Sequence, residues 1–554
     1  MSHDGNATND VPISRKAAYR AAGWWRPELL DDLVLSGHQR SAPALTEGSR
    51  SVSRGELADT ATACASGLRR LGVGAGDTAI VQLPNEIGML VLVLGLLRVG
   101  ALPVLTLPAL REHELDPVLA ALRPTIMAVP RRQRRFDHLA MARGLRQRHA
   151  CVRNLVVSGG GDLPDEVDLE ALWAEPARSP ATRRRSPSDV ALHLLSSGTT
   201  GAPKPIPRTH EAFGHVIRHA AEVSCLDESS VYLAALPATH SFAFGHPGVL
   251  GTLASGGRVV LAGPDDPAAA LRLVATEGVT HCALAPAVLL RWLQAAERDE
   301  YDTSSLRVLQ VGGSRLSETT AERAHALLGG RVQQVYGMSE GLLNFTRLDD
   351  PAEMIVGTQG RPSSPADETL VVDERGESVP TGETGELLAR GPGVIAGYHA
   401  GASAASFTAD GFYRTGDLVK MDPAGNFIVM GRVKDVINRG GEKIPADELE
   451  ALVVRHPSIR SAAAVAMPHA VLGEAVCLYA VSATDDGGVD LRALRMFLEQ
   501  HGLARFKLPE RLVEIDALPL TGVGKVDKVA LRADIADRLA QEELSPKRQT
   551  TPSP

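Results

Sequence analysis

Residues 194–204 read LLSSGTTGAPK, a polar loop that follows the apolar run VALHLL at residues 190–195. The loop presents hydroxyl groups, open backbone N–H groups and one lysine, which are the groups that bind phosphate oxygens. Its glycines permit a close approach that a side chain would block. The Walker pattern GxxxxGK[ST] is absent from it. The stretch therefore predicts a phosphate-binding loop of another type, although a Ser/Thr-rich surface loop has the same composition.

Short β-rich runs alternate with helical patterns on both sides of this loop. Buried strands are predicted at residues 78–83, 102–107, 125–129, 154–157, 258–262 and 306–311, with helices such as 54–71 and 268–277 between them. Such alternation indicates an α/β fold with doubly wound layers. Residues 368–390 and 412–430 instead predict closely spaced antiparallel strands, typical of a small β-barrel-like subdomain. After residue 431 a small α+β domain is expected, with a helix near Ala446, strands at 462–467 and 475–481, and helices from Asp490.

A chain of 554 residues is too long for one hydrophobic core. We therefore expect an N-terminal core over residues 1–431, a mobile C-terminal domain over 432–540 and a disordered tail over 541–554. Residues 175–188 are also predicted to be an exposed linker, because they are rich in proline, serine and charge. For the arginine groups at 131–135 and 183–185, solvated surface is favoured over a docking patch.

Composition excludes several classes of protein. The formal charge of −8 gives no general attraction to nucleic acid or to an anionic membrane. The five cysteines form no CxxC pair, so neither a disulfide framework nor a zinc site is indicated. The N-terminus is polar, and the apolar segment at 87–107 is interrupted by Arg98 and Pro103, leaving less than the ~20 residues that span a bilayer. A cytoplasmic protein with a buried helix and strand at 87–107 is expected.

Four further segments follow the loop in a fixed order: VYGMSE at 335–340, YRTGDL at 413–418, GRVKDVINRGGEKIPADELE at 431–450 and PLTGVGKVDK at 519–528. With these motifs, nearly the whole chain resembles the adenylate-forming superfamily of acyl-CoA synthetases, luciferases and nonribosomal-peptide adenylation domains. The resemblance implies an enzyme that uses ATP and Mg²⁺ to join a carboxylic acid to AMP. It then passes the acyl group to a phosphopantetheine thiol.

Adenylation brings two anions together, so the site must neutralise charge and align the reactants. By resemblance, the β- and γ-phosphates are held by Ser196, Ser197, Thr199, Thr200, Gly201 and Lys204. Glu340 is the expected Mg²⁺ ligand, and Ser339 stands where most of the superfamily has a threonine that bonds the α-phosphate. Adenine is expected between Tyr336, followed by Gly337, and the wall formed by Gly312, Gly313 and Ser314.

The resemblance also assigns residues nearer the C-terminus. Asp417 accepts the ribose hydroxyls with the help of Arg432; the alternative, a surface pair after a strand, is disfavoured by the surrounding motif. Lys525 bridges the substrate carboxylate and the α-phosphate, and its glycine-flanked loop suits a residue that enters and leaves a site. Lys434 occupies the hinge position about which the C-terminal domain rotates between the two half-reactions. Rotation withdraws Lys525 and brings the loop at 438–443 to the thiol.

HSFAFGHPG at 240–248, together with IPRTH at 206–210, looks closest to stand-alone aryl-acid ligases that activate salicylate or 2,3-dihydroxybenzoate for siderophores. The residues expected to bind the acid are His240, Ser241, Phe242, His246, Gly313, Gly341 and Leu342. Amino-acid-activating domains carry an aspartate at the position of Ser241, which disfavours an amino-acid substrate. Ser241 replaces the asparagine of the aryl-acid pattern, and His246 replaces a serine or cysteine. His246 either meets a ring substituent or packs beside the pocket; His240 is expected to line the site near carboxylate and phosphate.

Salicylate-type acids rank first, with ring-substituted salicylates, 3-hydroxyanthranilate and 3-hydroxypicolinate as alternatives. Because the chain stops soon after residue 539, the acceptor thiol is expected to come from outside: a separate aryl or peptidyl carrier protein, or coenzyme A. Two other hypotheses are an acyl- or benzoyl-CoA synthetase of general metabolism and a catalytically silent relative that serves as a scaffold. The presence of every motif residue that the chemistry needs disfavours the scaffold.

Overall fold

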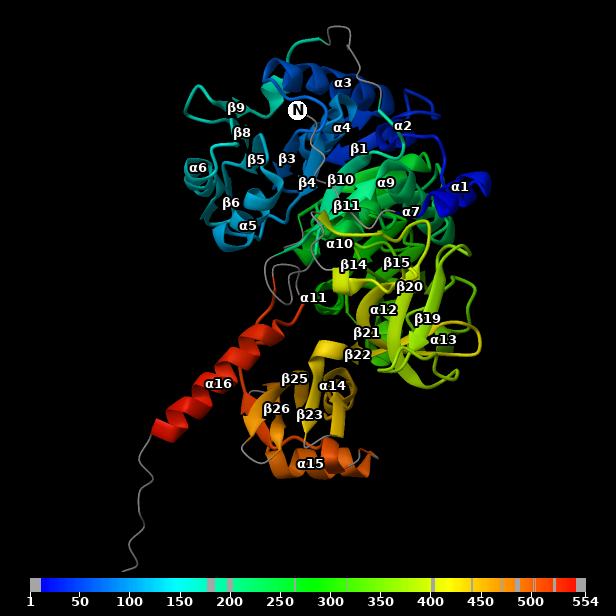
Figure 1. Ribbon diagram of the computed structural model, residues 1–554, viewed down its shortest axis with the longest axis vertical. Coiled ribbons are helices and arrows are strands. Elements are labelled where there is room, and N and C mark those ends of the chain that lie inside the picture. The colour runs from blue at the N-terminus through cyan, green and yellow to red at the C-terminus, as the bar shows by residue number, and fades with distance from the viewer. Residues whose placement is uncertain are drawn as a thin grey trace, which may run out of the picture. The chain divides into compact units, whose positions relative to one another are not determined.

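The computed structural model describes residues 11–176, 185–196, 203–263, 266–314, 316–399, 404–439, 442–469, 472–483, 489–501, 503, 505–521 and 525–544. The chain divides into two compact units, which are treated separately (Figure 1). Unit 1 comprises Met1–Leu370, Leu388–Thr415 and Met421–Ile428; unit 2 comprises Val371–Leu387, Gly416–Lys420 and Val429–Pro554. The boundary expected between residues 431 and 432 stays a prediction.

A seven-stranded sheet carries the polar loop of unit 1. Its order is β11 (Pro205–Thr209), β10 (Val190–Leu195), β4 (Leu102–Leu105), β3 (Thr78–Val81), β5 (Ile126–Pro130), β8 (Asn154–Ser158) and β9 (Glu166–Asp168). All neighbours are parallel except β10 and β11, which form an antiparallel pair. The loop at 196–204 thus joins two strands at the edge of a buried sheet.

A nine-stranded sheet forms the other half of unit 1. Its order is β18 (Arg361–Pro362), β17 (Leu343–Phe345), β16 (Arg331–Gly337), β15 (Val308–Gly312), β14 (His281–Leu284), β12 (Val231–Ala234), β13 (Arg258–Leu261), β1 (Pro43–Glu47) and β2 (Arg50–Ser53). The strands from β16 to β1 are parallel, and both edges are antiparallel. The doubly wound α/β prediction is confirmed.

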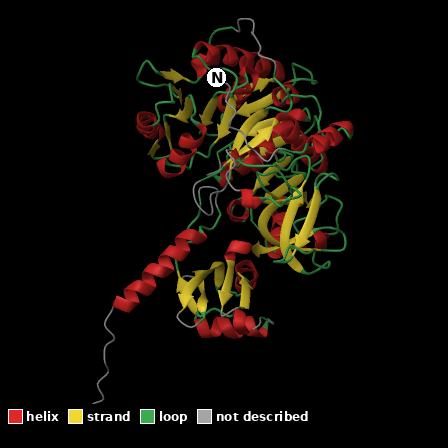
Figure 2. Cartoon of the chain, in the orientation of Figure 1, coloured by secondary structure: helices red, strands yellow, loops and turns green. Residues whose placement is uncertain are grey.

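Helices alternate with strands along the chain and lie outside the two sheets (Figure 2). The helices of unit 1 are α1 (Ile13–Ala21), α2 (Leu30–Leu35), α3 (Arg54–Arg70), α4 (Ile87–Val99), α5 (Glu112–Leu122), α6 (His138–Arg148), α7 (His210–Val223), α8 (Ser241–Gly245), α9 (Gly248–Ala254), α10 (Pro267–Glu277), α11 (Pro286–Ala296), α12 (Glu318–Leu328) and α13 (Ala352–Gly357). Local sequence sets where they start: Ser53 and Glu56 form a reciprocal capping box at α3. The apolar α4 is buried and is followed by β4, as predicted. Among the described residues, no helix is both long and apolar enough to cross a membrane.

Unit 2 is built on a sheet of order β24 (Glu442–Pro445), β23 (Val436–Arg439), β26 (Gly473–Ser482) and β25 (Ile459–His469), with β27 (Arg511–Glu514) paired to β26. Side chains that alternate along β25 and β26 enter two separate cores. One core includes α14 (Ala446–Val453) and α15 (Leu491–Gln500); the other includes α16 (Lys528–Leu544). The sheet therefore has helices on both faces.

Four more strands follow one another in chain order in a small sheet: β19 (Glu368–Val372), β20 (Thr384–Arg390), β21 (Tyr413–Met421) and β22 (Phe427–Arg432). They occupy the region for which closely spaced strands were predicted. At the C-terminus, α16 continues to Leu544, four residues into the predicted tail. The rest of that tail, 545–554, lies outside the described residues.

The prediction of solvated surface is wrong for Arg185. Its guanidinium donates to Asp31 Oδ1 at 2.7 Å and to the Leu97 carbonyl at 2.6 Å, and its side chain is 17% exposed. Asp31 is buried, and a buried carboxylate requires a charged or hydrogen-bonding partner. Of the other predicted linker residues, 177–184 lie outside the described residues.

Candidate active site

The neck of the polar loop is closed by two hydrogen bonds. The Ser196 backbone N–H donates to the Lys204 carbonyl at 3.0 Å, and the Lys204 N–H donates to Ser196 Oγ at 2.9 Å. Lys204 Nζ lies 5.4 Å from the centre of the Tyr398 ring, a cation–π distance. Four predicted phosphate ligands, Ser197, Thr199, Thr200 and Gly201, lie outside the described residues. The structure thus fixes the two ends of the loop and the lysine.

Glu340, the predicted metal ligand, lies just beyond the end of β16 and is nearly buried. Its Oε1 accepts a hydrogen bond from the Tyr398 hydroxyl at 2.7 Å, and the Tyr398 and Tyr413 hydroxyls are 3.0 Å apart. Tyr398 therefore contacts both Lys204 and Glu340, two residues that are far apart in the sequence. Tyr398 lies outside all five sequence motifs, so no local pattern indicated it as a site residue.

Arg208 was also missed as a site residue. From β11, immediately after the loop, its guanidinium donates to the Glu340 carbonyl at 2.9 Å and to the Gly393 carbonyl at 2.8 Å. The side chain is 1% exposed, and burial lowers the pKa of Arg208 to about 10, which leaves it protonated at neutral pH. Arg208 thus ties the phosphate-loop strand to the backbone that carries Glu340. Its signal was the IPRTH segment, which was read only as a family likeness.

Gly341, expected at the acid pocket, directly follows Glu340 in a backbone conformation that only glycine readily adopts. Its φ is +126°, and a Cβ atom built on it would lie 1.9 Å from the Gly393 carbonyl oxygen. Other residues rarely adopt this conformation, and none fits this space. The neighbouring Leu342 is fully buried, so the turn continues directly into the hydrophobic core.

Predicted acid-binding and nucleotide-binding residues meet at α8. Ser339 Oγ donates to Ser241 Oγ at 2.9 Å. The Phe242 ring packs against Gly312, where an added Cβ would lie 3.2 Å from the ring and 2.6 Å from the Val335 carbonyl. His240 caps α8, since its Nδ1 accepts the Phe242 N–H at 3.3 Å. The residues predicted to bind the acid are therefore in direct contact with residues predicted to bind the nucleotide.

His246 lies at the far end of α8 and is 3% exposed. Burial, with help from Arg208 and His240, lowers its pKa well below the usual value, so the ring is neutral. The ring lies edge-on to Phe213, with centres 6.0 Å apart. Among the residues the structure describes, Nε2 has no hydrogen-bond partner. The ring is thus packed on one side and retains one unpaired nitrogen.

The predicted adenine site lies at the carboxyl ends of neighbouring parallel strands, where α/β sheets bind ligands. Gly312 ends β15 and pairs with Val335, next to Tyr336 on β16. Gly313 and Ser314 follow as exposed residues, and Gly337 is exposed at the end of β16. An added Cβ on Gly337 would lie 2.4 Å from Leu343 Cδ2, so a larger residue there would have to displace the Leu343 side chain.

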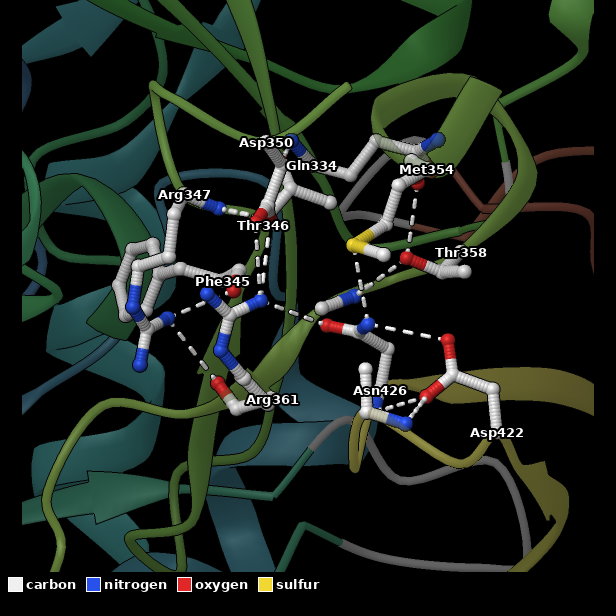
Figure 3. A network of polar contacts seen from close by, with 12 residues as sticks. Gln334, Phe345, Thr346, Arg347, Asp350, Met354, Thr358, Arg361, Asp422 and Asn426 are labelled. Atoms are coloured by element: carbon white, nitrogen blue, oxygen red, sulfur yellow. Dashed lines mark hydrogen bonds and ion pairs between the residues drawn. The ribbon is translucent and has the colours of Figure 1, made fainter. Parts of the chain in front are cut away.

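A polar network connects β16, β17 and β18 with the turn that precedes β22 (Figure 3). Arg361 donates to Asp350 and to Asn426 Oδ1, each at 3.0 Å. Asn426, which is fully buried, also donates to Asp422 at 3.0 Å. Since Asn426 immediately precedes β22, the network fixes the start of that strand against β18.

The remaining predicted residues belong to unit 2. Arg432 Nε lies 2.8 Å from Asp417 Oδ1, and the Asp417 side chain is 6% exposed. The predicted ribose pair is thus brought together. Lys434 is exposed in a single turn at Val433–Asp435. Lys525 follows residues 522–524, which lie outside the described residues.

The loop of Lys525 has a neck like that of Lys204. The Thr521 N–H donates to the Lys525 carbonyl at 2.7 Å, and the Lys525 N–H donates to Thr521 Oγ1 at 3.3 Å. Among the described residues, no group of three or more His, Cys, Asp or Glu side chains is arranged to hold a metal. A single carboxylate such as Glu340 still suits Mg²⁺, which is commonly held by one or two carboxylates together with substrate phosphates.

Comparison with known proteins gives the same assignment over the whole chain. Residues 35–399 match the family described as AMP-binding enzyme, and 448–525 match the AMP-binding enzyme C-terminal domain. A salicylyl-CoA synthase / salicylate adenylyltransferase of a Streptomyces species is 46% identical, covering 94% of this chain and 97% of the relative. The 2,3-dihydroxybenzoate-AMP ligase of Bacillus subtilis (strain 168) is 42% identical, covering 95% and 97%.

A solved structure also resembles the chain. The apo structure of Mycobacterium smegmatis MbtA aligns with a TM-score of 0.72 and 41% identity, covering 95% of this chain and 98% of the other. The ordered motifs, the two compact units and these relatives agree. The chain therefore belongs to the AMP-binding enzyme family, and it is an adenylate-forming ligase.

Proposed function

We propose that the protein joins an ortho-substituted aromatic acid, of the salicylate or 2,3-dihydroxybenzoate type, to AMP and releases pyrophosphate. It then transfers the acyl group to the phosphopantetheine thiol of a carrier protein. The observation that carries this proposal is the hydrogen bond from Ser339 to Ser241 at 2.9 Å. It places a hydroxyl expected to bind the α-phosphate beside a hydroxyl expected to bind the acid. This contact supports a site that receives the two reacting anions at adjoining positions.

In the first half-reaction a carboxylate oxygen bonds to the α-phosphorus while the bond to the pyrophosphate oxygen breaks. Lys204, held beside Tyr398, faces the departing pyrophosphate, and Lys525 bridges the carboxylate and the α-phosphate. Glu340 would hold Mg²⁺, which supplies charge neutralisation on the phosphates. Arg208 holds the Glu340 backbone in place by its hydrogen bond to the Glu340 carbonyl. The carboxylate is a competent nucleophile, so His240 lines the site and need not act as a base.

The acid is proposed from the pocket residues and from the names of the relatives. Ser241 has a hydroxyl on a short arm, and it replaces the aspartate that would pair with a free α-ammonium. The neutral His246 ring offers either a donor or an acceptor at Nε2, depending on its tautomer. Two relatives above 40% identity are named for salicylate and for 2,3-dihydroxybenzoate. Salicylate ranks first; 3-hydroxyanthranilate and 3-hydroxypicolinate are the alternatives that would use the same groups.

The second half-reaction is proposed to follow rotation about Lys434, in the cytoplasm, where ATP and the acceptor are available. A carrier of siderophore or nonribosomal-peptide biosynthesis is the preferred acceptor. Coenzyme A is the second candidate, because the Streptomyces relative is named both a salicylyl-CoA synthase and an adenylyltransferase.

The test is to supply ATP, Mg²⁺ and salicylate, and to follow salicyl-AMP by mass spectrometry. A phosphopantetheinylated aryl carrier domain or coenzyme A is then added in parallel. We expect the adenylate to form and the carrier to be loaded faster than coenzyme A. Faster release of salicyl-CoA would favour the ligase alternative. Failure to form an adenylate with any ortho-substituted aromatic acid would overturn the proposal.

A further inference from the structure

Lys528 ends the PLTGVGKVDK motif, three residues after Lys525, and the proposed function gives it no role. It is the first residue of α16. Its Nζ lies 3.0 Å from Asp447 Oδ1 and 2.9 Å from Glu450 Oε1, both on α14. The Lys528 side chain is 14% exposed. Although burial alone would lower the pKa of Lys528, Glu450 and Asp447 raise it, so the ammonium stays charged.

Hydrogen bonds on both sides of Lys525 join its segment to the start of α16. Beyond the neck at Thr521, the Asp527 N–H donates to the Pro519 carbonyl at 2.8 Å. Asp527 Oδ1 then accepts the N–H groups of Val529 and Ala530 at 3.1 and 3.0 Å, which caps the helix. The position of the loop is therefore set by the position of the first turn of α16.

That first turn is also tied to the hinge. Arg532, one turn after Lys528 and on the same helix face, pairs with Asp435 beside Lys434. Asp447, the partner of Lys528, lies against Gly431, where an added Cβ would be 3.6 Å from Asp447 Cγ. One ion pair thus connects the loop-bearing helix to the hinge turn, and the other connects it to α14, whose Asp447 lies close to Gly431 before the hinge.

A buried ion pair contributes little net stability, since desolvation of the charges offsets their attraction. Its geometry is nevertheless specific, because each nitrogen and oxygen must keep its partner. We infer that Lys528 is a positioning residue, which holds the Lys525 loop in a fixed relation to the hinge turn through Asp447 and Glu450. The inference rests on the proposed role of Lys525 in adenylation. The loop and the hinge then turn as one body.

The test compares Lys528→Met with Lys507→Met. Lys507 pairs with Glu448 of α14 at 2.7 Å and is 20% exposed. This ion pair does not involve α16. Pyrophosphate exchange, thiolation of pre-formed adenylate and Tm are measured for both variants and for Lys528→Arg. We expect Lys528→Met to lower kcat of exchange by roughly 10- to 100-fold, as a small misplacement does. KM for ATP and the rate of thiolation should stay near wild type, and Lys528→Arg should recover part of the loss.

Trypsin cleavage after Lys525, located by mass spectrometry, gives a readout that needs no activity. Lys528→Met should speed this cleavage relative to cleavage elsewhere, whereas Lys507→Met should not. Loss of both half-reactions together, in step with Tm, would overturn the inference, as would unchanged cleavage at Lys525. If none of the acids tested supports pyrophosphate exchange by the wild-type protein, the proposed function fails instead. The cleavage comparison then still decides whether Lys528 holds the loop.

Discussion

The two lysine loops, one in each unit, are closed in the same way and anchored differently. Ser196 with Lys204, and Thr521 with Lys525, exchange the same pair of hydrogen bonds: N–H to lysine carbonyl, and lysine N–H to hydroxyl. Beyond the neck, Lys204 enters β11, where Arg208 binds buried carbonyl groups. Lys525 instead leads to α16, which is held by ion pairs.

This difference matches the tasks proposed for the two lysines. A lysine that receives the β- and γ-phosphates needs a fixed place, and backbone bonds inside a large sheet provide it. A lysine that enters and leaves the site must move with its support, and a small unit linked by side-chain pairs can turn as a body. The following changes test the contrast, from the largest expected effect to the smallest.

Arg208→Met should have the largest effect. It removes the donor to the Glu340 and Gly393 carbonyls and leaves them buried without that partner. A buried carbonyl left without its hydrogen-bond partner costs about 1–3 kcal/mol, and this change affects two of them. Urea unfolding measures this cost, with Arg218→Met as the control, since Arg218 lies nearer the surface and pairs with Glu28. Equal losses in the two variants would show that Arg208 is no special anchor.

Lys525→Ala should lower adenylation by about 10²–10³-fold, the usual cost of removing one group that stabilises transition-state charge. Thiolation of pre-formed adenylate should persist, because the proposed rotation withdraws Lys525 during that step. Pyrophosphate exchange and single-turnover thiolation measure the two steps separately. Equal loss in both would rule out the proposed division of labour.

His193→Gln should change how stability depends on pH. His193 lies on β10, before the Lys204 loop, and burial, with help from His399, lowers its pKa to about 3. Since the folded-state pKa is below that of the unfolded chain, His193 supports stability above about pH 6.5, and this support is lost as the pH falls. The loss is about 1 kcal/mol between pH 7.5 and 5.5. The free energy of unfolding of His193→Gln should fall less over this range; parallel curves would contradict the account.

Opening the two necks should have the smallest effects. Ser196→Ala and Thr521→Val each remove one hydrogen bond, worth about 0.5–1.5 kcal/mol. We expect Ser196→Ala to raise KM for ATP and Thr521→Val to lower kcat of exchange, by a few-fold each. Steady-state kinetics at varied ATP separates the two effects. If both variants changed only KM, the proposal that Lys204 is fixed and Lys525 moves would be contradicted.

The sequence predicted the features that depend on local pattern. Alternating apolar runs placed β3, β5, β8 and β15 within a few residues of their observed bounds. The ordered motifs predicted that Asp417 and Arg432 would act together, and the structure brings them into contact. The resemblance also named Gly341 for the acid pocket, and the structure adds a tight backbone contact with Gly393 that requires glycine at this position.

Contacts made across the fold could not be predicted in this way. Tyr398 reaches Glu340 from a segment without a motif, and Arg208 reaches two carbonyl groups more than a hundred residues away. Arg185 looked like part of a charged linker, but the buried Asp31 that it neutralises lies far upstream. Such partners depend on how distant elements pack, which local periodicity does not record.

The central claim is that the protein adenylates an ortho-substituted aromatic acid. The most direct measurement is ATP–pyrophosphate exchange across a panel that contains salicylate, 2,3-dihydroxybenzoate, 3-hydroxyanthranilate, 3-hydroxypicolinate, benzoate and a straight-chain fatty acid. The account predicts the highest kcat/KM for an ortho-hydroxy acid, salicylate first, with benzoate well below it. Preference for the fatty acid, or equal use of benzoate and salicylate, would contradict it.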